Sequence, residues 1–187
     1  MKKFFESHWG ATLVTLLVIV ASTLMNVNMK LGSKCQEVSD AFYNGVYVKS
    51  DGYTHKSISS QLDMRSSAAN GIISIASGYE ELEAETQALL VARTELIVAN
   101  SISEKHAANK ATQAAYDDLV AAMALVDTTE HSNALSTYMS NFTGAQKVIE
   151  ASGYNEYVRQ FTRENLDVFP TNYLVGIAGI TPPELFA

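Results

Sequence analysis

The sequence predicts an all-α protein in which one N-terminal transmembrane helix precedes a long antiparallel bundle of three to four helices. Three observations lead to this prediction. Residues 9–29 contain no Asp, Glu, Lys or Arg; apolar residues recur three or four positions apart over much of the remaining chain; and only 3 of the 187 residues are proline. Apolar residues at this spacing share one face of a helix, and such helices bury their apolar faces against one another.

The N-terminal segment has the length and composition of a membrane anchor. At about 1.5 Å of rise per residue, residues 9–29 would cover about 30 Å, the thickness of the hydrocarbon core of a bilayer. Lys30 and Lys34 follow the apolar run at the expected interface, and an aromatic residue, Trp9, lies at its other edge. We therefore assign residues 9–31 to the anchor. Its predicted lipid-facing residues include Trp9, Leu13, Leu16, Leu17, Ile19 and Leu24.

A cleaved signal peptide is the alternative for this segment, because Lys2 and Lys3 precede the apolar run. The run is longer than a typical signal-peptide core and no A-x-A-like site follows it, so we expect an uncleaved anchor behind a polar lead, residues 1–8. Lys2 and Lys3 favour an N-terminus in the cytoplasm and a soluble domain outside it, whereas Lys30 and Lys34 favour the reverse. Of the two orientations we favour the first.

The soluble part of the chain is acidic. From Gln36 onward, 9 Lys and Arg stand against 19 Asp and Glu, which argues against nucleic acid as a partner and against binding flat on anionic lipid. Cys35 is the single cysteine, so no intrachain disulfide can form. Because Lys34 precedes it, a lipoprotein signal is disfavoured; an intermolecular disulfide stays possible, and we expect a thiol on the helix surface.

The apolar pattern divides the remaining chain into helices. Thr54–Ser57 offers a cap for the first bundle helix, Gly71 and Gly78 indicate close packing or a kink, and Pro170 should end the last long helix. The apolar tail should dock on the bundle, near the membrane or on a partner subunit. The predicted segments are a juxtamembrane helix at 32–50 with a turn at 49–52, a bundle at 55–170 and the tail at 171–187. Within the bundle they are a long helix at 55–100, a loop or helical tip at 101–112, a short helix at 113–127, and a second long helix at 130–168 with a kink or register change at 151–153.

The sequence shows no pattern typical of catalysis or metal binding. None of the four histidines, His8, His55, His106 and His131, has another His or a Cys three or four residues further on, so we predict no metal site, no cofactor and no catalytic residue. The acidic run at 80–85 is expected to be a solvated helix face. Two arginines lie on or near the apolar stripe and need partners. We expect Arg65 and Arg93 to pair locally with Asp63, Glu83 or Glu95; a salt bridge between subunits is the alternative.

Two groups of motifs resemble the LemA family in order and spacing. The first is Gln61-Leu-Asp-Met-Arg65, followed by Gly78-Tyr79-Glu80 and Ala92-Arg93; the second is Tyr154-Asn155-x-x-Val158, followed by Phe169-Pro170-x-Asn172. The chain departs from the family pattern at Ser66, where a second arginine is usual, and at 68–72, where a proline is missing. The residues assigned to the family motifs are Gln61, Leu62, Arg65, Tyr79, Ala92, Arg93, Tyr154, Asn155, Val158, Phe169 and Pro170.

The resemblance implies a membrane-anchored helical bundle of the bacterial cytoplasmic membrane without an established catalytic activity. We therefore expect a non-enzymatic scaffold that acts through coiled-coil-like self-association or through binding of other membrane or envelope proteins, with lipid around its anchor. Small residues in the anchor, such as Gly10, Ala11, Ala21 and Ser22, favour a homo-oligomer because they permit close helix approach. The alternatives are an accessory subunit of a membrane protease complex and an extracytoplasmic sensor whose ligand meets the tip at 101–112.

Overall fold

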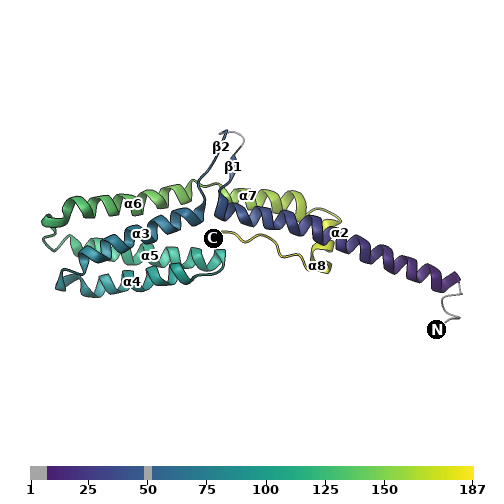
Figure 1. The fold of residues 1–187 in the computed structure, drawn as a ribbon, viewed down its shortest axis with the longest axis horizontal. Coiled ribbons are helices and arrows are strands. Elements are labelled where there is room, and N and C mark those ends of the chain that lie inside the picture. Colours follow the sequence, from purple (N-terminus) through teal and green to yellow (C-terminus); the bar gives the residue numbers. More distant parts are fainter. Residues whose placement is uncertain (1–7, 49–51) are drawn as a thin grey trace. The chain divides into compact units, whose positions relative to one another are not determined.

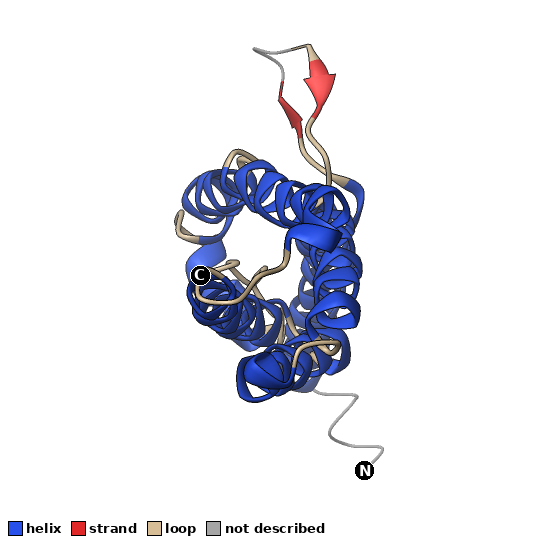
Figure 2. Ribbon diagram, turned by 90° about the vertical axis from the view of Figure 1, so that its left-hand side faces the viewer, coloured by secondary structure: helices blue, strands red, loops and turns tan. Residues whose placement is uncertain are grey.

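A computed structural model describes residues 8–48 and 52–187, and nearly all of its elements are helical (Figures 1 and 2). Two compact units can be separated. The anchor unit comprises Met1–Ser39 and Val158–Pro183, and the bundle unit comprises Asp40–Tyr157 and Glu184–Ala187. The predicted polar lead, except for His8, and the predicted turn residues 49–51 lie outside the described residues.

The N-terminal helix, α2 (His8–Asn44), includes the apolar segment and continues beyond residue 31. The predicted juxtamembrane helix at 32–50 is too long, because α2 ends at Asn44 and a strand follows at Tyr47–Val48. Among the described residues α2 is the one helix long and apolar enough to cross a membrane. The helix is followed by Gly45, which has a positive φ of 87°. A side chain there would meet the carbonyl oxygen of His55 at 2.0 Å, so only glycine fits.

The C-terminal part of the anchor unit packs against α2. It contains the end of α7 (Tyr154–Phe161), a π-helical turn (Thr162–Leu166) and α8 (Thr171–Ile177). Leu166 and Ile180 form a small apolar cluster with Cys35, which is only 3% exposed. The predicted surface thiol is therefore wrong, because the tail covers that side of α2. Burial also raises the pKa of the Cys35 thiol.

In the bundle unit, a short antiparallel hairpin follows the last residues of α2. Strand β1 (Tyr47–Val48) pairs with β2 (Tyr53–Thr54), with Tyr47 opposite Thr54. Ser57 then caps the first bundle helix, since its side chain accepts a hydrogen bond from the backbone N–H of Ser60 at 3.1 Å. The cap predicted within 54–57 is thus confirmed.

In the described part of the chain, the antiparallel helices α3 to α6 make up the bundle, which confirms the predicted fold class (Figure 1). In this bundle α3 packs against α4 and α6, and α4 packs against α5. Gly71 of α3 lies where a Cβ atom would come within 2.6 Å of the Tyr138 ring of α6, which confirms close packing at this glycine. The helices are α3 (Ile58–Ala76), α4 (Glu83–Val98), α5 (Ile102–Met123) and α6 (Ser132–Glu150), with 3-10 turns at Glu80–Leu82 and Thr129–His131.

The first predicted long helix, 55–100, is wrong because the chain turns back at 77–79. Gly78 lies in this turn, and the reversal buries Leu82 and Leu89 completely. The apolar spacing continues across the turn, so periodicity alone did not reveal it. Of the two alternatives for 101–112, the loop is wrong and the segment is helical: α5 starts at Ile102, after a capping box in which Ser101 and Glu104 bond each other's backbone N–H groups.

The second predicted long helix, 130–168, divides where the pattern skips. Helix α6 ends at Glu150 and α7 begins at Tyr154, while Gly153 between them has a φ of 70°. The predicted irregularity at 151–153 is therefore confirmed, as a complete break between two helices. The missing apolar stripe at 101–112 also has a cause, since the buried residues there other than Ile102 are small or polar, namely Ala108, Asn109 and Thr112.

Candidate functional site

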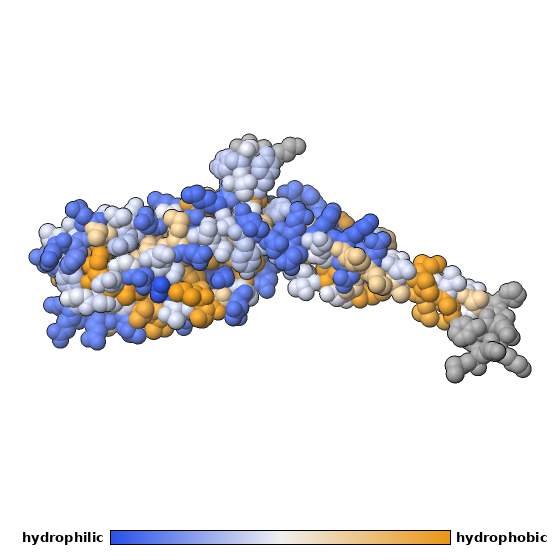
Figure 3. All heavy atoms as spheres, viewed as in Figure 1, coloured by the Kyte–Doolittle hydropathy of each residue, from blue (hydrophilic) through white to orange (hydrophobic). Residues whose placement is uncertain are grey.

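The predicted anchor residues lie mostly on the outside of α2. Trp9, Leu16 and Ile19 are more than half exposed, at 85%, 61% and 57%; Leu13 and Leu17 are also exposed, and Leu24 is half-buried. Figure 3 shows hydrophobic residues around the N-terminal half of this helix. Its hydroxyl groups bond the helix itself: Thr15, Ser22 and Thr23 each donate to the carbonyl oxygen four residues earlier. This part of the surface suits lipid, because these three hydroxyl groups are satisfied within the helix.

Arg65 is the largest fully buried side chain of the described residues. Its guanidinium donates from Nη1 to the side-chain oxygens of Asn109 (2.5 Å) and Gln146, and from Nη2 to Gln113 Oε1 (2.5 Å). The guanidinium carbon also lies 4.1 Å from the centre of the Phe142 ring. The local ion pair predicted for Arg65 is thus wrong, because three amide oxygens from α5 and α6 surround the charge.

Each glutamine in this cluster links the buried cation to an acidic residue. Gln113 donates from Nε2 to Asp117 Oδ1 at 2.8 Å, and Gln146 donates from Nε2 to Glu150 Oε1 at 2.9 Å. Both acids lie one turn further along their helices, so each amide dipole is aligned between a cation and an anion. The opposite charges therefore act on Arg65 through polarised amides rather than by direct contact.

The electrostatics of Arg65 reflect this arrangement. Burial lowers the pKa of Arg65 to about 10, while Asp117 and Glu150 oppose that effect. Its Nε has no hydrogen-bond partner within the described chain. Because the group is fully enclosed and joins α3 to α5 and α6, the arrangement positions helices and is closed to a substrate. Sequence reasoning missed Asn109, Gln113 and Gln146.

The other N-terminal motif residues also serve packing between helices. Gln61, Leu62 and Ala92 are buried. Arg93 donates from Nε to the carbonyl oxygen of Ser66 at 2.9 Å, which joins α4 to α3. Tyr79 and His131 connect the two turns at one end of the bundle, with 3.0 Å between the phenol oxygen and Nδ1.

The Tyr154-Asn155 motif holds the segment Glu184–Phe186. The Asn155 side chain donates to the Phe186 carbonyl oxygen and accepts from the Phe186 backbone N–H, both at 2.8 Å. Tyr154 donates its hydroxyl to the carbonyl oxygen of Glu184 at 2.8 Å. The Phe186 ring packs against Phe42, with 5.7 Å between ring centres. Burial, with a contribution from Glu184, raises the pKa of Tyr154 to about 12.

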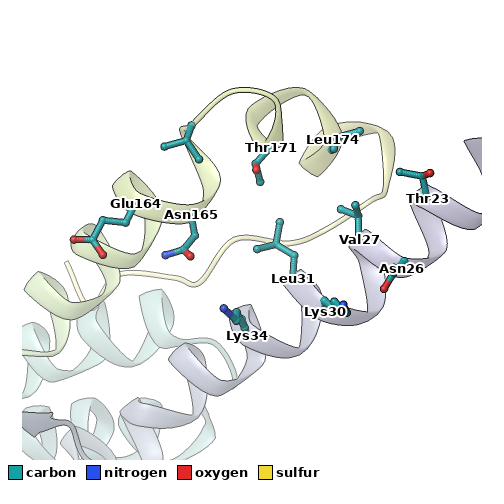
Figure 4. A pocket seen from close by; sticks show the side chains of 11 residues that line it. Thr23, Asn26, Val27, Lys30, Leu31, Lys34, Glu164, Asn165, Thr171 and Leu174 are labelled. Atoms are coloured by element: carbon teal, nitrogen blue, oxygen red, sulfur yellow. The ribbon is translucent and has the colours of Figure 1, made fainter.

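The remaining motif residues lie in the anchor unit. Val158 is buried, whereas Phe169 is 82% exposed and precedes a cis peptide bond to Pro170 at the start of α8. An open groove of about 480 Å³ runs between α2 and α8. Figure 4 shows Val27 and Leu31 projecting from α2 toward Thr171 and Leu174. Its charged lining residues are Lys30, Lys34 and Glu164.

No group of three His, Cys, Asp or Glu side chains suited to a metal ion occurs within residues 8–48 and 52–187. The titratable groups described above pack between helices, cap a helix or line the open groove.

Comparison with known proteins gives one match. The model of the LemA family matches residues 54–187, which is most of the chain and includes both groups of motifs. Neither a curated protein nor a solved structure matches the chain.

Proposed function

This chain belongs to the LemA family, and from that premise we propose that it is a membrane-anchored, non-catalytic scaffold whose bundle binds a second copy of itself or another membrane protein. The proposal requires two surfaces. One is the exposed apolar half of α2, which is suited to lipid. The other is a protein-binding face on the bundle.

The observation that carries the proposal is a second apolar stripe, on the outside of α4 and α5. Val98 of α4 and Ala107 of α5 line one shallow groove between the two helices. Figure 3 shows hydrophobic residues gathered over α4. On each helix the exposed residues of this stripe follow one another at spacings of four, three and seven residues. They are Ala84, Ala88, Val91 and Val98 on α4 and Ala107, Ala111, Ala114 and Ala121 on α5.

These stripes have the pattern of a helix-pairing surface. Single exposed apolar residues are normal on soluble proteins, but a heptad pattern on two adjacent helices is not required by the core that they already form. Most of the side chains are alanine, so another helix could approach closely. Glu95 and Asp118 occupy the two remaining heptad positions and would lie within the interface.

The alternatives receive less support. An accessory subunit of an enzyme could contribute a reactive residue to the active site. Arg65, the most unusual polar group, does not suit that role because its side chain is fully enclosed. For a sensor, the segment 101–112 would have to meet ligand; Ala108, Asn109 and Thr112 are buried, and the exposed Ala107 and Ala111 belong to the stripe described above.

The test is the size of the full chain in mild detergent and its crosslinking in native membranes. We expect the wild type to form an oligomer or to crosslink to a partner. The variant V91E/A111E should lose this association, because each carboxylate would be buried in the interface. Ser140→Glu, at an exposed position of α6, is the matched control and should behave as the wild type. A monomeric wild type without a crosslinked partner would exclude the scaffold role, and an intact assembly of V91E/A111E would exclude this surface.

A further inference from the structure

The groove between α2 and α8 lies at the level where the uncharged run of α2 ends, and its interpretation rests on the proposed membrane anchoring. On α2 its lining extends from Thr23 to Lys34, about 16 Å along the helix axis. Near its middle, Asn28 donates from Nδ2 to the carbonyl oxygen of Ala178 at 2.7 Å, just beyond α8. With residues 9–29 in the hydrocarbon core, α8 would therefore lie at the membrane surface.

Along α2, from Thr23 toward Lys34, the lining of the groove changes from apolar to basic. Val27, Leu31 and Leu174 supply its apolar part. Lys30 and Lys34 lie one turn apart, and neither ammonium group forms a hydrogen bond or an ion pair within the described part of the chain. A molecule that matches this lining has an anionic head group and a hydrocarbon chain.

Exposed apolar residues on α8 and just before it extend the same surface. Phe169, Tyr173 and Ile177 follow one another at four-residue spacing and are 82%, 66% and 68% exposed. The apolar cluster of the anchor unit uses Val175 and Ala178 instead. Exposed aromatic residues beside a spanning helix are typical of the interfacial region of a bilayer.

We propose that the α2–α8 groove binds an acidic phospholipid from the surrounding membrane. The head-group phosphate lies near Lys30 and Lys34, and an acyl chain lies against Val27 and Leu174. Glu164 also lines the groove, but its Oε1 accepts a hydrogen bond from Gln160 at 2.9 Å, and the two lysines leave the groove with a net positive charge. Phe169, Tyr173 and Ile177 insert beside the bound lipid.

Native mass spectrometry of the full chain in detergent tests the head-group site, with phosphatidylglycerol and phosphatidylcholine as the two ligands. The wild type should bind phosphatidylglycerol about 25-fold more tightly, since each of the two lysines near anionic lipid contributes roughly fivefold. In K30Q/K34Q the preference should fall to within about twofold, whereas K105Q/K110Q, with the same change in charge on α5, should keep it. Inorganic phosphate at millimolar concentration should not compete; competition by free phosphate, or an equal preference in all three proteins, would overturn the proposal.

The position of α8 is tested by Trp fluorescence in reconstituted vesicles. In the double variant W9F/Y173W, brominated phosphatidylglycerol should quench the indole introduced at position 173 strongly. Absence of quenching, as would follow if a second copy covered α8, would overturn the insertion. Carbonate extraction of the wild type separates the two hypotheses: release of the chain refutes the membrane anchor itself, whereas retention without lipid preference or quenching refutes only the groove.

Discussion

Helix α2 and the bundle helices contain similar apolar residues but place them in opposite environments. Leu16 and Ile19 of α2 lie on the surface, whereas Leu62 and Ile72 of α3 are buried. Their polar residues differ in the same way. The hydroxyls of Thr15, Ser22 and Thr23 bond their own helix, whereas Arg65 depends on partners from two other helices.

Helix α2 and the bundle therefore differ in what stabilises each of them. The apolar part of α2 satisfies its own backbone hydrogen bonds, so as a membrane span it would need only an apolar solvent around it. The bundle forms cooperatively, because the buried charge of Arg65 is tolerable only when α3, α5 and α6 are all in place. Changes in α2 should therefore alter membrane retention, and changes around Arg65 should alter folding.

The largest expected effect comes from placing charge in the span. The variant L16K/L17K should weaken insertion by about 6 kcal/mol, because each Leu→Lys change costs roughly 3 kcal/mol near the centre of a membrane helix. Carbonate extraction should then release the protein, while the thermal unfolding of the bundle stays unchanged. L16A/L17A is the control and should remain in the membrane fraction. Full retention of the lysine variant would contradict the assignment of the span.

Removal of the buried cation should have the next largest effect. Arg65→Ala should lower the free energy of unfolding by about 3–4 kcal/mol, since it leaves buried amide oxygens without a donor and creates a cavity. Arg65→Lys should cost about 2 kcal/mol because an ammonium group cannot reproduce the planar fork. Urea denaturation measures both, with Arg93→Ala, which loses one hydrogen bond, as the comparison at about 1 kcal/mol. Equal losses for Arg65→Ala and Arg93→Ala would refute the central role of Arg65.

Tyr154 should make part of the stability pH-dependent. Its pKa in the folded protein, about 12, lies above its ordinary value of 10. The folded state therefore retains the phenol proton where the unfolded state has lost it, so this stabilisation is complete below pH 10 and is lost between pH 10 and 12. Tyr154→Phe should cost about 1 kcal/mol at pH 8 through the lost bond to Glu184. The difference in unfolding free energy between wild type and variant should shrink as pH rises to 12; a constant difference would contradict the assignment.

The smallest expected effect concerns Gly71 and Tyr138. Gly71→Ala alone should destabilise the bundle by about 1 kcal/mol, because the new methyl group meets the Tyr138 ring. In a Tyr138→Ala background the same change should stabilise the bundle by roughly 0.5–1 kcal/mol through helix propensity. A double-mutant cycle by urea denaturation measures this reversal of sign. The same effect in both backgrounds would mean that the glycine is not needed for packing.

Local signals were sufficient for much of the fold. The uncharged run of α2, the cap at Ser57 and the break before Gly153 could be predicted, since each depends on neighbouring residues. The start of α5 could also have been found, because Ser101 and Glu104 have the spacing of a capping box. The turn at 77–79 could not be predicted from periodicity, because the helical spacing of apolar residues continues across it.

The sequence by itself determined that the chain is helical, that one segment suits a membrane and that the chain resembles the LemA family. Each of these conclusions depends on residues that lie close together in the sequence. Only the tertiary structure decided which polar groups meet. Asn109 and Gln146 are 37 residues apart in the chain and converge on Arg65, and the tail that covers Cys35 comes from the far end of the chain. Such contacts depend on the direction of each helix after its turn, so a one-dimensional pattern could not reveal them.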